Sequence, residues 1–218
     1  MQAAKRIRVD RGRGFVAFAL AVLAFHHLPT IDVLNLGIVI DGFTPLAVVG
    51  SAAALLLGER PGSRTLVVAF LAALAYVDGH GIHMAANAIN GADPTGLAGD
   101  RTELWDERIG HIVWHLGWFA LVFAFCLAER DRPGTVPGPR ASAVAIAALG
   151  FTLFTSTVEG QTWPLMLAAA AGFVGWAAAA RRPLLVRCAA AFALAAALVG
   201  IWAVWQGGVP EFTEVWNV

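Results

Sequence analysis

Seven long apolar runs, separated by short polar segments, constrain this chain more than any other feature of its sequence. A helix needs about 20 apolar residues to cross the hydrocarbon core of a bilayer. Proline, glycine and arginine punctuate the runs, as in ERPGSR and ERDRPGTVPGPR. The expected membrane spans cover approximately residues 12–28, 42–58, 64–90, 103–128, 141–158, 163–180 and 184–206.

The composition places the chain in the membrane class. Of its 218 residues, 58% are hydrophobic and only 14% are charged, whereas a soluble domain carries about 25% charged residues. We therefore predict an all-α integral membrane protein, a bundle of seven transmembrane helices that forms a single domain over residues 1–218. The expected partners are the lipid bilayer and, because Ala- and Gly-rich helices pack closely, further copies of the chain. The formal net charge is zero, and no nucleic-acid partner is expected.

Two further features narrow the interpretation. Cys126 and Cys188 lie within apolar helical runs, which argues against a disulfide framework or a CxxC metal site. The N-terminal MQAAKRIRVDRGRG and the apolar run after it are typical of a signal peptide, but no small-residue cleavage site follows. We therefore expect a first helix that is retained.

The basic residues predict the orientation of the bundle. With seven spans, only Arg101 and Arg108 fall on one side of the membrane, and the other 13 Lys and Arg residues fall on the opposite side. Basic residues favour the cytoplasmic side. The N-terminus is thus expected in the cytoplasm and the C-terminus outside, in a multi-pass protein of the cytoplasmic membrane.

Four of the six histidines lie on the two expected spans 64–90 and 103–128. At 100° per residue, His80, His83 and Asn87 share one face of the first of these helices. On the second helix, residues spaced by four form one stripe: Glu103, Glu107, His111 and His115. Because consecutive antiparallel helices usually lie side by side, we expect the two faces to meet around one buried cavity.

This combination predicts a metal site. Ionisable groups in hydrocarbon are costly and usually functional, and imidazole with carboxylate binds divalent transition metals, with zinc favoured and iron or copper possible. The predicted ligands are His80, His83, His111, His115 and Glu107. Asp78 and Asp106 lie off the two faces; with Asn87 and Glu103, they are expected to support the ligands or cap a helix. A proton relay, or a polar network without an ion, would use the same residues.

The leading functional hypothesis is a metal-dependent membrane hydrolase. A metal with three protein ligands keeps one position for water and lowers the pKa of that water to about 7. Glu107 and Glu159 are the expected proton-transferring residues, although Glu159 is also explained as a loop acid. An apolar cavity, open to the external or periplasmic side, would receive a lipid or another hydrophobic amide or ester.

Two alternatives remain open. Iron or copper at the same residues would support oxidation of a lipid. A metal or proton transporter would bind its ion near the middle of the membrane, where His115 is expected. The inner halves of the spans lack ionisable residues, which counts against a continuous polar path.

The seven spans and the histidine-rich face resemble the general architecture of alkaline ceramidases and adiponectin-type receptors. That resemblance implies an HxxxH pattern on the last span. Here the last span has no histidine, and the pattern is His111-x-x-x-His115 on the fourth. HMAAN (residues 83–87) is similar to the HxxxN pattern of rhomboid proteases, but the GxSG nucleophile motif of that family does not occur.

Overall fold

The structure of the chain, a computed structural model, describes residues 11–30, 36–59, 61–92, 96–131 and 136–216. Nearly all of this part is helical, and it contains no β-strand. The elements in chain order are α1 (Arg11–His27), η1 (Leu28–Thr30), α2 (Leu36–Glu59), α3 (Ser63–Ala92), α4 (Leu97–Glu103), η2 (Leu104–Gly110), α5 (His111–Asp131), α6 (Pro139–Glu159), α7 (Trp163–Ala180), α8 (Pro183–Gln206) and α9 (Phe212–Trp216). The prediction of an all-α chain is confirmed for these residues.

Six helical segments are long and apolar enough to cross a membrane, and they indicate a multi-pass membrane protein. They are Leu36–Leu56, Ser63–Ala92, Arg101–Asp131, Pro139–Glu159, Trp163–Ala180 and Pro183–Gln206. The first expected span is also helical and apolar, but Gly12–His27 is shorter than the other six.

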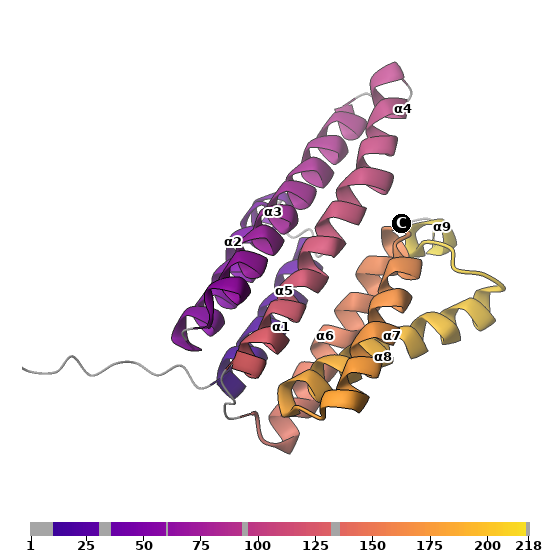
Figure 1. Cartoon of the computed structure of the whole chain (residues 1–218). Coiled ribbons are helices and arrows are strands. Elements are labelled where there is room, and N and C mark those ends of the chain that lie inside the picture. The colour runs from indigo at the N-terminus through magenta and orange to yellow at the C-terminus, as the bar shows by residue number, and fades with distance from the viewer. Residues whose placement is uncertain (1–10, 31–35, 60, 93–95, 132–135, 217–218) are drawn as a thin grey trace, which may run out of the picture.

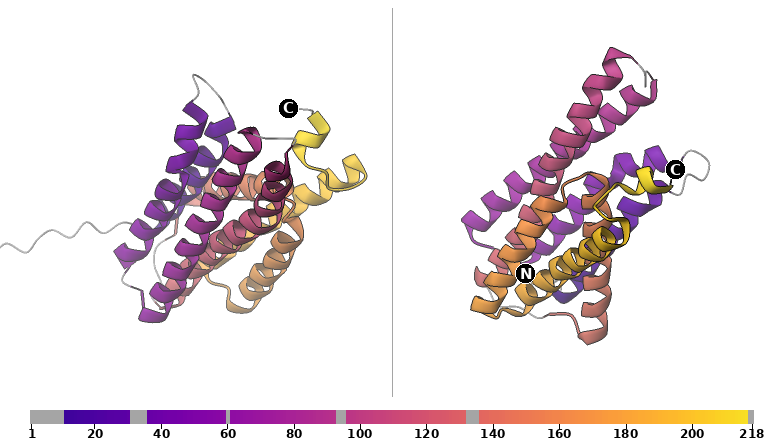
Figure 2. Two further views of the ribbon diagram at one scale, coloured as in Figure 1. Left: turned by 90° about the horizontal axis from the view of Figure 1, so that it is seen from above. Right: turned by 90° about the vertical axis from the view of Figure 1, so that its right-hand side faces the viewer.

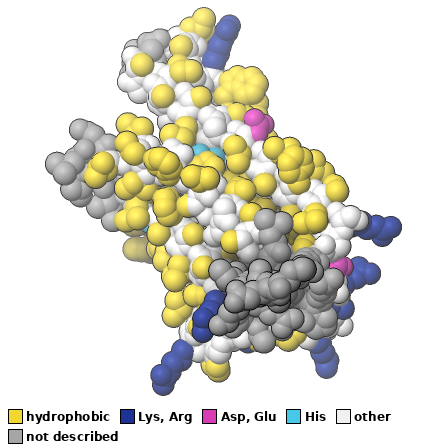
Figure 3. All heavy atoms as spheres, turned by 90° about the vertical axis from the view of Figure 1, so that its left-hand side faces the viewer, with side chains coloured by type: hydrophobic (Ala, Val, Ile, Leu, Met, Phe, Trp, Pro, Cys, Tyr) yellow, Lys and Arg dark blue, Asp and Glu magenta, His cyan; other side chains and the backbone are white. Residues whose placement is uncertain are grey.

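The outward faces of these helices are as apolar as their sequences. Large hydrophobic side chains are strongly exposed, among them Ile38 at 77%, Leu46 at 70% and Val204 at 87%. Hydrophobic side chains are spread over the face in Figure 3, and Lys and Arg side chains are seen at its top and, more often, in its lower half. Water would disfavour so much exposed apolar surface, whereas lipid would solvate it.

Proline and glycine set the helix boundaries. Pro139, Pro164 and Pro183 stand in the first turns of α6, α7 and α8, where a missing backbone N–H leaves no donor unsatisfied. Gly207 ends α8 with a φ of 71°, a left-handed conformation that glycine adopts without steric cost.

The helices pack in two groups that share α5 as a neighbour. α3 packs chiefly against α5, α1 against α2 and α6, and α8 against α6 and α7. The segments α4, η2 and α5 form one long rod, and this rod and α3 extend together beyond the other helices at one end (Figures 1 and 2). Buried aromatic and aliphatic side chains of α5 fill the space between the groups, including Trp118, Leu121, Val122 and Phe125.

A buried carboxylate ties the far end of α5 to the start of α8. Glu129 is 2% exposed, and its two carboxylate oxygens accept hydrogen bonds from the backbone N–H groups of Leu184 (2.8 Å) and Leu185 (3.1 Å). The guanidinium of Arg182 donates to the backbone carbonyl of Glu129 at 3.0 Å. The first N–H groups of α8 thus receive acceptors that the helix itself cannot supply.

Candidate metal centre

Two glycines let α3 and α5 come into backbone contact, and this contact brings their histidines together. A Cβ atom added at Gly79 would overlap the backbone N of Trp114 and lie 2.6 Å from its Cα. At Gly117, an added Cβ would overlap the backbone N of Tyr76 and lie 2.7 Å from its Cα. Any larger residue at these two positions would push the helices apart.

A π-helical turn sets the direction of the acidic residue beside the histidines. Over η2 the chain forms a π-helix, and the backbone N–H of His111 bonds the carbonyl of Asp106, five residues earlier rather than four. The extra residue in the turn changes the angular spacing assumed for a regular α-helix. Asp106 therefore reaches the face from which His111 projects, although regular spacing places it elsewhere.

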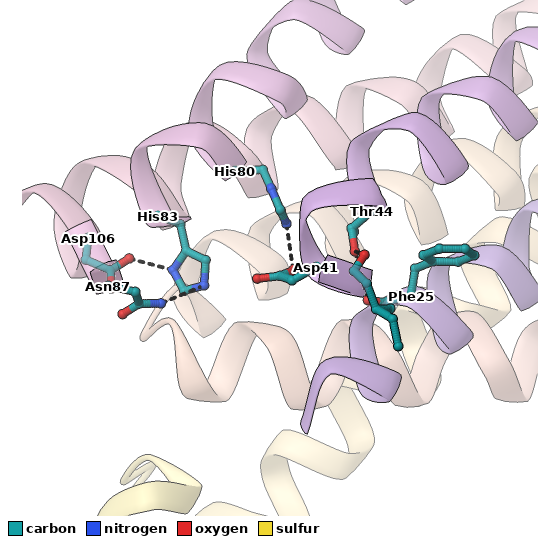
Figure 4. Close-up of polar contacts among 8 residues, drawn as sticks. Phe25, Asp41, Thr44, His80, His83, Asn87 and Asp106 are labelled. Atoms are coloured by element: carbon teal, nitrogen blue, oxygen red, sulfur yellow. Dashed lines mark hydrogen bonds and ion pairs between the residues drawn. The ribbon is translucent and has the colours of Figure 1, made fainter. Parts of the chain in front are cut away.

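His83, Asp106 and His111 form the candidate metal centre. One potential ligand atom of each lies within 4.8 Å of the others. Nδ1 of His83 lies 2.6 Å from Oδ1 of Asp106, and Nδ1 of His111 lies 3.9 Å from the same oxygen. Figure 4 shows His83 projecting from α3 toward Asp106 on the neighbouring rod. His111 and Asp106 are 5% and 6% exposed, whereas His83 is only partly buried, so the cluster lies between the helices with one side toward the surface of the cavity.

The spacing of these atoms suits a metal after small side-chain shifts. A tetrahedral zinc with ligand distances of about 2.0–2.2 Å holds its ligand atoms about 3.4 Å apart. The 2.6 Å contact is shorter than this separation and the 3.9 Å contact is longer. Both differ from it by less than about 1 Å. The ligand atoms of the two histidines lie within 4.8 Å of each other, so the side chains would have to rotate to close around an ion.

Asn87 contacts the ring nitrogen of His83 that Asp106 does not contact. Its amide lies 3.1 Å from Nε2 of His83 (Figure 4). With Nδ1–H donating to Asp106, Nε2 accepts a hydrogen bond from the amide NH₂. With a metal on Nδ1, Nε2 would carry the proton, and the amide oxygen would accept it after a rotation of the Asn87 amide. Asn87 therefore fits the supporting role that its position on α3 predicts.

The other two predicted histidine ligands point to different partners. Nε2 of His80 lies 3.0 Å from Oδ1 of Asp41 on α2 (Figure 4). His115 lies deeper, with Nε2 2.7 Å from Oγ of Ser156 and Nδ1 2.7 Å from Oγ1 of Thr162. Neither histidine belongs to the three-residue cluster.

A cavity of about 960 Å³ opens beside the cluster. Polar groups from six helices line part of its wall: His26, His27, Asp41, His83, His111, Thr155, Ser156, Glu159 and Thr213. The rest of its wall is mostly apolar, with Phe154, Leu198, Trp202, Phe212 and Trp216 among its residues. An apolar pocket with a few converging polar groups is the usual form of a binding site for a hydrophobic ligand.

The predicted catalytic acids fall in different places. Glu159 lines the cavity, and its carboxylate accepts a hydrogen bond from the backbone N–H of Phe212 at 2.9 Å. Glu107 belongs to η2, but its side chain lies outside the described ones. Glu103 and Asp78 are exposed, and Glu103 lines a second cavity of about 620 Å³.

Acidic residues line both cavities. Glu211 lines the second cavity, while Glu159 lines the first. Burial and the nearby charges of Glu159 and Glu214 raise the pKa of the Glu211 carboxyl. Arg108 also lines the second cavity, so side chains of both charge signs lie at this end of the bundle.

Sequence reasoning missed Ser156, Thr162 and Asp41 as partners of the histidines, and it placed Asp106 outside the ligand set. The first three are distant in the chain from the histidines they bond, and only the packing of α2, α6 and α7 against α3 and α5 reveals them. The chain matches no protein-family model, no curated protein and no solved structure, so the centre is interpreted from its own geometry.

Proposed function

We propose that this chain is a metal-dependent membrane hydrolase that cleaves an ester or amide bond in a lipid or a similar amphiphile. One observation carries the proposal: in a cluster of two histidines and one aspartate, both histidines line a large, mainly apolar cavity. Catalytic zinc sites typically use three protein ligands and keep the remaining position for water.

We assign the following roles to these residues. His83, Asp106 and His111 would hold a divalent metal, with zinc favoured, which would supply a water of lowered pKa, about 7. The apolar wall around Trp202 and Phe212 receives the hydrocarbon part of the substrate. Glu159 lies on the same wall and is the proposed general base.

The proposed setting is a bundle of seven transmembrane spans in the cytoplasmic membrane, with the N-terminus in the cytoplasm. The distribution of Lys and Arg supports it, because 13 of the 15 basic residues then fall on the cytoplasmic side. The cavity then opens toward the external side, where the C-terminal α9 lies.

A second candidate has specific support from the same ligand set. Two histidines and one carboxylate with open positions also form the facial triad of non-haem iron oxygenases. Such a centre would oxidise a lipid instead of hydrolysing it. The identity of the bound metal separates the two candidates, since zinc does not undergo redox chemistry.

The experiment uses purified full-length protein in detergent and a fluorogenic ester with a long acyl chain. We expect hydrolysis that stops after chelation, returns when zinc is restored, and is lost in Asp106→Asn. Asp78→Asn is the matched control, because Asp78 is exposed and outside the cluster, and it should retain activity. Full activity in chelated, metal-free protein would contradict the proposal, and ferrous-iron-dependent oxidation of a lipid would replace it with the second candidate.

A further inference from the structure

A hydrogen-bonded chain of three buried side chains starts at the wall of the same cavity, where Ser156 lies, and runs through His115 to Thr162. Oγ of Ser156 lies 2.7 Å from Nε2 of His115, and Nδ1 of His115 lies 2.7 Å from Oγ1 of Thr162. The three residues come from α6, α5 and the start of α7. They are 2%, 0% and 4% exposed, respectively, so the chain is almost completely shielded.

The hydroxyl of Ser156 differs from those of its neighbours on α6. Thr152 and Thr157 are also buried, but their hydroxyls bond carbonyls of their own helix, those of Ala148 (2.8 Å) and Leu153 (2.6 Å). This is the usual arrangement for such residues inside a helix. Ser156 instead bonds an imidazole on another helix, and it also lines the cavity.

The hydroxyl of Thr162 sets which ring nitrogen of His115 carries the proton. When its hydroxyl oxygen accepts the Nδ1–H of His115, the lone pair on Nε2 faces Ser156 and accepts the hydroxyl proton. A nucleophile and a base within about 2.6–3.2 Å, with the base oriented by a third group, are the geometric signature of nucleophilic catalysis. A purely structural network would need no hydroxyl at the wall of a cavity.

We propose that Ser156 is a nucleophile for acyl transfer, with His115 as its base and Thr162 as the residue that positions the base. Oγ of Ser156 forms a bond to the carbonyl carbon of an ester, and its proton moves to Nε2 of His115. The bond from carbon to the leaving oxygen breaks, and the leaving alcohol takes that proton. Water then cleaves the acyl-serine and regenerates the hydroxyl.

This inference rests on the proposed function only for the class of substrate, an acyl ester of an amphiphile. The rings of His111 and His115 stack with centroids 6.0 Å apart, so the metal cluster and Ser156 would act on one substrate in one cavity. The serine chemistry requires no metal, and it can therefore be tested on chelated protein.

The test uses full-length protein in detergent and a long-chain alkyl fluorophosphonate, which traps activated serines by forming an O–P bond with loss of fluoride. We expect one adduct, located by peptide mass spectrometry at Ser156, in both chelated and metal-loaded protein. Ser156→Ala should abolish the adduct. His115→Gln should slow labelling by about 100-fold, a typical contribution of a general base.

Thr152→Ala is the matched control, because Thr152 lies one turn earlier on α6, is buried and does not line the cavity. It should label at the wild-type rate. Thr162→Val keeps the base and removes only its orienting group, so it should slow labelling less than His115→Gln does. Thermal unfolding in detergent checks that each variant is folded.

Two results would overturn the inference: folded wild-type protein that forms no adduct at Ser156, or His115→Gln that labels as fast as wild type. Neither bears on the metal, whose presence is measured separately. Chelated protein that labels at Ser156 but no longer hydrolyses the ester would agree with both proposals. Chelated protein that labels at Ser156 and still hydrolyses the ester at the full rate would remove the metal-dependent hydrolase and leave the serine nucleophile.

Discussion

The rod formed by α4, η2 and α5 buries a carboxylate near each end, and the two carboxylates have different surroundings. Glu129 accepts hydrogen bonds from two backbone N–H groups, one on each oxygen, and it caps α8. Asp106 lies 2.6 Å from one histidine and 3.9 Å from another, beside a cavity of about 960 Å³. Glu129 is thus held by the fold, whereas Asp106 has histidines as its close partners.

The difference separates a structural acid from a candidate functional one. Two neutral backbone N–H groups already satisfy the hydrogen-bonding capacity of the Glu129 carboxylate, so this carboxylate needs no further partner. Imidazoles can exchange a proton for a metal ion, so the surroundings of Asp106 allow two chemical states. Burial alone does not distinguish the two acids, since Glu129 is 2% exposed and Asp106 is 6% exposed.

The largest expected effect on stability comes from Glu129→Ala. It leaves two buried N–H donors of α8 without acceptors and breaks the contact between the ends of α5 and α8. We expect a loss of about 3 kcal/mol in the free energy of unfolding, measured by thermal or denaturant unfolding in detergent. Metal content per folded protein should not change; a parallel loss of metal would mean that the two ends of the rod are coupled.

Gly79→Ala should damage both stability and the metal centre. The added Cβ would overlap the backbone of Trp114 and force α3 away from α5, at a cost of about 1–3 kcal/mol. Gly81→Ala is the matched control on the same helix, because a Cβ at Gly81 meets nothing within 4 Å. Equal unfolding midpoints and equal metal content in the two variants would contradict the close packing that positions His83.

Asp106→Asn should affect the metal far more than the fold. An amide replaces the charged ligand at nearly the same volume, so we expect the metal affinity to fall by about 100-fold or more. The free energy of unfolding of the metal-free protein should change by less than about 1.5 kcal/mol, the net value of one hydrogen bond. Competition against a chromophoric chelator gives the affinity. If Asp106→Asn lost more stability than Glu129→Ala, Asp106 would be the structural acid, and the assignment of roles would be wrong.

His80→Gln should have the smallest effect on metal binding. His80 bonds Asp41 instead of the cluster, and glutamine can still donate a hydrogen bond to that carboxylate. Removal of a residue that bonds a ligand typically lowers metal affinity at least tenfold. Because His80 bonds Asp41 and not a ligand of the cluster, we expect metal affinity within about threefold of wild type. A loss as large as that in His83→Ala would show that His80 is a ligand, as its position on the helix face predicts.

Much of the fold follows from the sequence alone. The seven apolar runs all form helices, and proline and glycine mark their ends, because a helix satisfies its backbone hydrogen bonds without help from distant residues. The number of membrane spans follows less directly from the sequence. Gly12–His27 is apolar but shorter than the six other candidates, and its length alone does not make it a span.

The site was predictable only where regular helix geometry holds. His83 and Asn87 lie four residues apart on α3, and they contact each other as that spacing predicts. The π-helical turn at Leu104–Gly110 breaks this regularity and brings Asp106 toward His111. No local pattern in the sequence marks that turn, because tertiary packing against α3 stabilises it.

The central claim is that His83, Asp106 and His111 bind one metal ion, and X-ray absorption of the metal-loaded protein tests it most directly. We predict nitrogen and oxygen ligands at about 2.0–2.2 Å, with the outer-shell signal of two imidazoles. Either His83→Ala or His111→Ala should remove one of these imidazoles. A sulfur shell at about 2.3 Å, or a spectrum unchanged in both variants, would contradict the claim.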